Sequence, residues 1–175
     1  PSREPPFEAH PEMCAKEITD TVLAELKTGH FRTARLNYAN GDMVGHTGNF
    51  AATVKAVEVV DACLGRLEQQ IIAQQGAMIV TADHGNADDM LKKKKKTQSI
   101  LHDASGNVIP KTAHSLNRVP FTVVLPDRYQ KQFSLANISS PALGNVTATL
   151  AMLLGYRCPE DYLPSLLLFK GSSQY

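Results

Sequence analysis

Apolar residues recur at helical spacing in three stretches of the chain. The first precedes Gly29, the second runs from Phe50 to Ile71 before Gly76, and the third starts at Val146 and ends before Gly155. A spacing of three to four residues places apolar side chains on one face of a helix, and a glycine after the last of them is a common helix stop. The pattern therefore predicts three amphipathic helices, built on these positions: Ala15, Ile18, Val22 and Leu26; Phe50, Val54, Val57, Leu64, Leu67 and Ile71; Val146, Leu150, Leu153 and Leu154.

Short apolar runs predict buried strands between these helices. Residues 77–81 and 119–125 form the clearest runs, and residues 31–38 form a weaker one. Runs of this length are typical of strands that are covered on both faces. Helices that alternate with such strands predict an α/β fold: a three-layer, mostly parallel sheet with helices on both faces.

A polar segment separates the second and third strand candidates. It holds the lysine run 92–96 and a turn-forming stretch at residues 103–107, which short apolar pairs flank. We predict a surface hairpin or lid-like excursion around residues 88–112. The lysine run is interpreted as a solvated loop tip rather than a contact to phosphate or nucleic acid.

Composition narrows the class of protein. The chain has 175 residues, 43% of them hydrophobic and 20% charged, with a net charge of +1. These values are typical of one globular domain and exclude a disordered chain or a dedicated nucleic-acid binder. No apolar run approaches the roughly 18 residues of a membrane span. Three widely spaced cysteines without a CxxC pair indicate a reducing compartment, so we expect a cytoplasmic protein without nucleic-acid or membrane partners.

Carboxylates and imidazoles gather at predicted strand ends. Asp42 and His46 follow the first strand candidate, Asp83 and His84 follow the second, and His114 lies shortly before the third. Ligands of α/β sheets bind beyond strand ends, and mixed oxygen and nitrogen donors suit Mn²⁺, Zn²⁺ or Co²⁺ better than Ca²⁺. Residues four apart in a helical turn share one face, whereas adjacent residues converge only where the chain turns. The combination favours a metal site, although each motif alone is more often an ordinary polar surface or turn.

The remaining histidines have no such context. His10, His30 and His102 are expected to be exposed to solvent.

Three longer motifs resemble one known family. Residues 37–48 read NYANGDMVGHTG, residues 81–90 read TADHGNADDM and residues 112–117 read TAHSLN. In this order and spacing they resemble the cofactor-independent (2,3-bisphosphoglycerate-independent) phosphoglycerate mutase family. The resemblance extends from about residue 1 to the end of the chain, and strings of this length are specific.

The resemblance implies an alkaline-phosphatase-like fold and an isomerase of glycolysis and gluconeogenesis. Such an enzyme interconverts 3-phosphoglycerate and 2-phosphoglycerate through a phosphoserine, without a 2,3-bisphosphoglycerate requirement. The family pattern implies two divalent ions, typically Mn²⁺, with Co²⁺ or Mg²⁺ in some members. By this pattern Asp42, His46 and His114 would bind one ion, and Asp83 and His84 would bind the other.

Other parts of the family pattern have no match here. The serine nucleophile and the arginines that grip substrate come from segments to which no part of this chain corresponds. We therefore expect residues 1–175 to be the C-terminal portion of the metal-binding phosphatase domain, incomplete without an N-terminal segment of its own chain. The chain would contain no catalytic nucleophile, would be inactive alone, and would belong to an enzyme that is a monomer when complete.

Two alternatives stay open. One is another phosphotransferase of the alkaline phosphatase superfamily, such as a phosphopentomutase or a phosphodiesterase. The other is a non-catalytic module that binds a metal and uses the lysine run 92–96 to contact an anionic partner.

Overall fold

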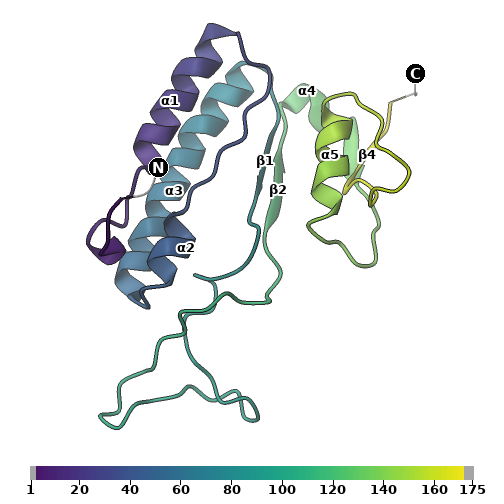
Figure 1. Cartoon of the computed structure of the whole chain (residues 1–175). Helices are drawn as coiled ribbons and strands as arrows, with labels where there is room; N and C mark the ends of the chain where they lie inside the picture. The colour runs from purple at the N-terminus through teal and green to yellow at the C-terminus, as the bar shows by residue number, and fades with distance from the viewer. Residues whose placement is uncertain (1–2, 172–175) are drawn as a thin grey trace. The chain divides into compact units, whose positions relative to one another are not determined.

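The computed structural model describes residues 3–171 of the chain (Figure 1). These residues form two compact units, described separately below. One comprises residues 3–70 and 84–119, and the other comprises residues 71–83 and 120–171. No helix in the described part of the chain is both long enough and apolar enough to cross a membrane.

Two long helices dominate the first unit. Helix α1 (Ala15–Thr28) and helix α3 (Phe50–Ala73) lie side by side (Figure 1). Ala15 packs against Val59 and Cys63, and small side chains at this contact let the helix backbones approach closely. Gly29 adopts a φ of 72° directly after α1, a left-handed conformation that glycine tolerates. Both predicted helices are therefore confirmed.

A third helix of this unit lies in the glycine-punctuated stretch that follows residues 31–38. Helix α2 (Asn40–Gly45) buries Val44 in a cluster with Met13, Ala52 and Ala56. The amide of Asn40 donates to the carbonyl oxygens of residues 11 and 12, at 2.8 and 2.9 Å. Tertiary packing of this kind outweighs the low helix propensity of glycine. The short 3₁₀ helix η1 (Phe7–Ala9) precedes α1, and Phe7 packs against the same cluster.

The predicted strand over residues 31–38 is wrong. This segment is extended or bent, but it joins no strand or bridge in the described structure. Apolar composition favours a strand only where a neighbouring strand accepts its hydrogen bonds. Within the described residues, this segment pairs with no strand.

The second unit contains all four strands that the described residues form. Strand β1 (Met78–Thr81) pairs with strand β2 (Phe121–Val124), so both clear strand predictions are confirmed. The pair is antiparallel, with Met78 opposite Val124. Strand β3 (Phe133–Leu135) and strand β4 (Leu167–Phe169) form a second antiparallel pair.

The predicted parallel pairing is thus not found among residues 3–171. A parallel pair needs a crossover to the opposite end of the sheet, whereas the segment from β1 to β2 brings the chain back to the end where it left.

The C-terminal part of this unit is tied together by buried polar side chains. It contains helix α4 (Asp127–Gln130) and helix α5 (Asn145–Leu153), and the latter confirms the third predicted helix. Asn145 accepts from the backbone of Ala142 at 2.7 Å and donates to the carbonyl of Pro164 at 2.8 Å. The bond to Pro164 connects the segment that precedes β4 to helix α5.

Residues 88–112, the excursion, form an irregular loop of the first unit that isolated β-bridges hold together. Its isolated bridges join Leu91 to Pro110, Lys93 to Ile100 and His102 to Val108. At its base the carboxylate of Asp89 pairs with Lys111 at 2.7 Å and with Lys93 at 3.1 Å.

Candidate metal centre

Helix α2 presents the first two candidate ligands. Asp42 lies within the helix, and His46 follows its last residue and donates its backbone N–H to the carbonyl of Asp42 at 3.0 Å. Residues four apart share one helix face. The His46 Nε2 atom accordingly lies 3.2 Å from Asp42 Oδ1.

Two further imidazoles converge on the same carboxylate. His114 Nε2 lies 3.1 Å from Asp42 Oδ1 and 3.1 Å from His46 Nε2. His84 Nε2 lies 4.0 Å from Asp42 Oδ1, and its ring stacks on that of His114 with centroids 3.7 Å apart. Ligand atoms of Asp42, His84 and His114 all lie within 4.8 Å of one another, a grouping that can hold a metal ion.

A backbone carbonyl fixes the tautomer of His46 that leaves Nε2 free to bind a metal. Its Nδ1 atom meets the carbonyl oxygen of Thr112, which can only accept, so Nδ1 carries the proton. In the neutral ring Nε2 then presents a lone pair to Asp42 and His114. A backbone carbonyl that fixes a ring in this way is a common partner of metal-binding histidines.

The donor set therefore fits a divalent cation. A carboxylate oxygen and imidazole nitrogens at these separations bring several lone pairs to one point, an arrangement that a cation stabilises. All four residues belong to the first unit.

Asp83 belongs to the second unit, and its side chain is exposed. The structure thus brings together the three predicted ligands of one ion and adds His84 to them. The assignment of Asp83 and His84 to a second ion stays a prediction.

Asn86 is a neighbour of the site that the sequence analysis did not single out. Its side chain is 4% exposed, and Nδ2 donates to Asp42 Oδ1 at 2.9 Å and to the Asp42 carbonyl at 3.2 Å. Its position two residues after His84 in the 81–90 motif was the available signal.

Asp88 and Ser115 connect the segment that follows His84 with the segment that follows His114. Ser115 is buried, and its hydroxyl donates to Asp88 Oδ2 at 2.9 Å, while Asn117 Nδ2 donates to the same oxygen at 2.6 Å. Burial acts to raise the pKa of Asp88, but the hydrogen bonds from Asn117, Ser115 and nearby backbone amides outweigh it, so the pKa is lowered. The carboxylate is therefore held in its charged form.

The remaining histidines behave as predicted. His10, His30 and His102 are exposed. Cys14, Cys63 and Cys158 are free thiols.

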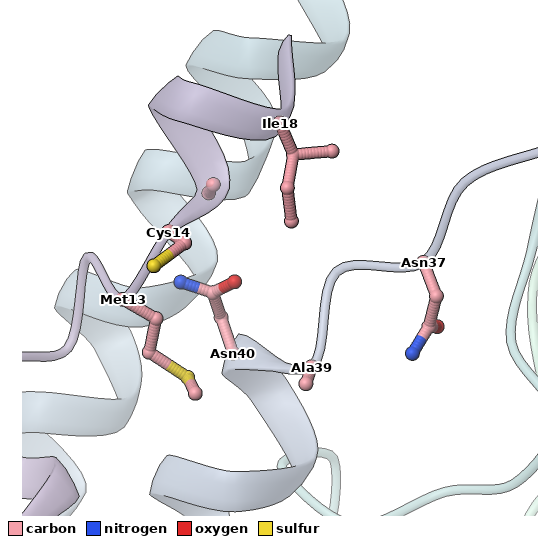
Figure 2. Close-up of a pocket in the computed structure, with 7 residues that line it drawn as sticks. Met13, Cys14, Ile18, Asn37, Ala39 and Asn40 are labelled. Carbon is pink, nitrogen blue, oxygen red and sulfur yellow. The ribbon is translucent and has the colours of Figure 1, made fainter. Parts of the chain in front are cut away.

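A separate cavity of about 250 Å³ lies between the start of α1 and residues 37–40 (Figure 2). Met13, Cys14 and Ile18 line it from one side, and Asn37 and Asn40 from the other. The amide of Asn40 is already bonded to backbone carbonyls, so the cavity gathers few polar groups for a ligand.

Comparison with known proteins places the site in a family. A model of the metalloenzyme superfamily matches residues 5–157. The chain is 46% identical over 162 residues to a probable 2,3-bisphosphoglycerate-independent phosphoglycerate mutase of Leptospira interrogans, covering 93% of this chain and 29% of that protein. It is 42% identical over 170 residues to the 2,3-bisphosphoglycerate-independent phosphoglycerate mutase of Trypanosoma brucei brucei, covering 95% of this chain and 30% of that protein.

A solved structure is similar throughout. It is that of Leishmania mexicana phosphoglycerate mutase at low cobalt concentration, with a TM-score of 0.91 and 40% identity, covering 97% of this chain and 31% of that one. The chain thus spans less than a third of the length of these relatives.

These similarities confirm the α/β, alkaline-phosphatase-like fold class and the resemblance noted in the sequence. The matched region contains Asp42, His46, His84 and His114. The chain belongs to the metalloenzyme superfamily.

Proposed function

We propose that this chain is the C-terminal, metal-binding portion of a phosphoglycerate mutase that does not require 2,3-bisphosphoglycerate. The whole enzyme would interconvert 3-phosphoglycerate and 2-phosphoglycerate through a phosphoserine, as a cytoplasmic monomer in glycolysis and gluconeogenesis. The observation that carries the proposal is the convergence of Asp42 Oδ1 with the Nε2 atoms of His46, His84 and His114.

Asp42, His46 and His114 would hold one divalent ion, with Mn²⁺ as the first candidate and Co²⁺ or Mg²⁺ as alternatives. Asp83 and His84 would serve a second ion. When bound, such ions activate a serine hydroxyl and neutralise phosphoryl oxygens. The carboxylate of Asp42 supplies negative charge, and Thr112 keeps the proton of neutral His46 on Nδ1.

The nucleophile would come from outside this chain. Ser115 directly follows His114, but it is buried, so a phosphoryl group would not reach its hydroxyl. Residues 1–175 would then form one portion of the phosphatase domain, with the excursion at its surface, and an N-terminal portion would supply the serine and the substrate-binding groups.

A chimera tests this proposal. The chain replaces the segment that it matches in the Leishmania mexicana enzyme, and turnover of 3-phosphoglycerate is followed by coupling to enolase. We expect mutase activity that disappears when a chelator removes the metal and returns with Mn²⁺. A folded chimera that binds Mn²⁺ but does not turn over 3-phosphoglycerate would contradict the proposal.

A further inference from the structure

The His84 and His114 segments meet through very little backbone pairing. Gly85 and Ser115, the residues that follow these two histidines, form an isolated bridge in which the N–H of Ser115 donates to the carbonyl of Gly85 at 2.8 Å. One bridge aligns two chains only loosely, because no ladder continues on either side. The stacked rings, 3.7 Å apart, therefore need support from elsewhere.

Asp88 gives this support from the His84 side. Its carboxylate accepts the hydroxyl of Ser115, with Oγ at 2.9 Å from Oδ2 and 3.2 Å from Oδ1. It also accepts the amide of Asn117 at 2.6 Å. Two donors that flank residue 116 thus bind one charged group, and hydrogen bonds to a charged group are stronger than neutral ones.

The glycine between the two segments makes this contact possible. A Cβ atom at Gly85 would lie 2.6 Å from Asp88 Oδ1 and would overlap Ser115 Oγ. Only a residue without a side chain leaves the space in which the carboxylate and the hydroxyl meet.

We propose that Asp88 is a positioning residue that acts through Ser115 to hold His114 against His84, so that the ligand set is organised before a cation binds. The inference rests on the metal site proposed above. Asp88 itself contacts Ser115 and Asn117 rather than the candidate ligands, so its effect is indirect.

The test uses Co²⁺ as the probe, in the 175-residue chain and in the chimera. Asp88→Ala and Ser115→Ala are compared with Asp103→Ala, a matched control. The carboxylate of Asp103 also accepts several hydrogen bonds, from the backbone of Ser105 at 2.8 Å and from Asn107 at 2.9 and 3.4 Å, but it lies within the excursion. Co²⁺ affinity and the visible absorption of the bound ion are measured, together with the thermal midpoint of the metal-free protein.

We expect Asp88→Ala and Ser115→Ala to weaken Co²⁺ binding by about 10- to 100-fold, as the loss of groups that orient metal ligands generally does. The absorption of bound Co²⁺ should change in both, because the approach of His114 changes. The double variant should bind no more weakly than the weaker single one, because both changes break one contact. Asp103→Ala should bind Co²⁺ as the unmodified protein does.

Unchanged Co²⁺ affinity and absorption in Ser115→Ala, which loses only a hydroxyl, would overturn the proposal. So would a loss in Asp103→Ala equal to that in Asp88→Ala, or lower thermal midpoints without any change in Co²⁺ binding. An unmodified chimera that binds Co²⁺ but lacks mutase turnover would contradict the proposed function alone, so the two failures are distinguishable.

Discussion

Two glycines of helix α2 offer a controlled test of how tightly the metal centre is packed. A Cβ atom at Gly45 would lie 2.6 Å from Asn86 Oδ1 and 3.0 Å from Asn86 Cγ, whereas one at Gly41 would meet no atom within 4 Å. Neither glycine has a positive φ. Alanine therefore gives similar helix propensity at both positions but adds a steric conflict only at Gly45.

The magnitude follows from these distances. Ordinary contact begins near 3.4 Å, so Asn86 must retreat by about 0.8 Å in Gly45→Ala. Asn86 is 4% exposed and bonded to Asp42 at 2.9 Å, so it has little room to move. Forcing an extra methyl group into a packed site costs about 1–3 kcal/mol. The gain from replacing glycine in a helix, up to about 1 kcal/mol, is common to both variants and cancels in their difference.

We therefore expect the free energy of unfolding of Gly45→Ala to lie about 1–3 kcal/mol below that of Gly41→Ala. Urea unfolding of the metal-free protein measures this difference without a contribution from bound ions. Gly45→Ala should also bind Co²⁺ more weakly, because the displaced amide no longer orients Asp42. Equal unfolding free energies for the two variants would refute the packing argument.

Three further predictions concern the site, the excursion and the isolated chain. In the chimera, His46→Ala should lower turnover by on the order of a hundredfold or more, because it removes a candidate ligand, whereas the exposed His102→Ala should keep both rate and metal content; equal losses would contradict the assignment of ligands. Hydrogen bonds from Lys111 and Lys93 lower the pKa of Asp89 below its ordinary 3.8. The charged carboxylate of Asp89 therefore stabilises the fold fully at pH values above 3.8. This stabilisation is lost as the pH falls through the lowered pKa of Asp89. Urea midpoints of Asp89→Asn and the unmodified protein should then differ at pH 6, and this difference should shrink as the pH is lowered below 3.8; a constant difference would be inconsistent with this mechanism. The purified 175-residue chain with Mn²⁺ should show no mutase turnover in the enolase-coupled assay, and turnover would show that the chain contains its own nucleophile.

The three longer helices were predictable because the residues that define them lie within one stretch of sequence. Helical spacing marked α1, α3 and α5, and the glycines that follow α1 and α5 adopt φ values of 72° and 80°. Periodicity and stop residues lie within one stretch of chain, so no knowledge of tertiary contacts is needed to interpret them.

Elements that depend on distant partners were not predictable. Residues 31–38 have strand-like composition but pair with no strand among the described residues. Strand β4 has only three residues, and its partner Phe133–Leu135 lies more than thirty positions earlier in the chain. The direction of the β1–β2 pair depends on the course of the excursion, which hydrophobic spacing does not encode.

Some contacts of the candidate metal site follow from local sequence spacing, and others depend on segments that are far apart in the chain. The approach of Asp42 to His46 follows from their spacing of four residues. The stacking of His84 on His114 brings together segments thirty residues apart, joined by the bridge between Gly85 and Ser115 and by the hydrogen bond from Ser115 to Asp88, and no local pattern reveals these contacts. Asn86 was missed because asparagine after a glycine is equally common in ordinary turns.

Hydrogen bonds and an ion pair join the two ends of the excursion, so residues can be inserted at its far end without moving the candidate metal ligands. Lys111 is fastened to the start of the excursion by its ion pair with Asp89 and by a backbone bond to Met90 at 2.8 Å, so changes beyond this point need not move His84 or His114. Gly106 adopts a φ of 84°, and a Cβ atom there would meet no atom within 4 Å. Lengthening a flexible loop costs only about 0.6 kcal/mol for each doubling. A peptide tag or fluorescent reporter inserted beside Gly106 would thus label the protein while leaving the metal ligands in place.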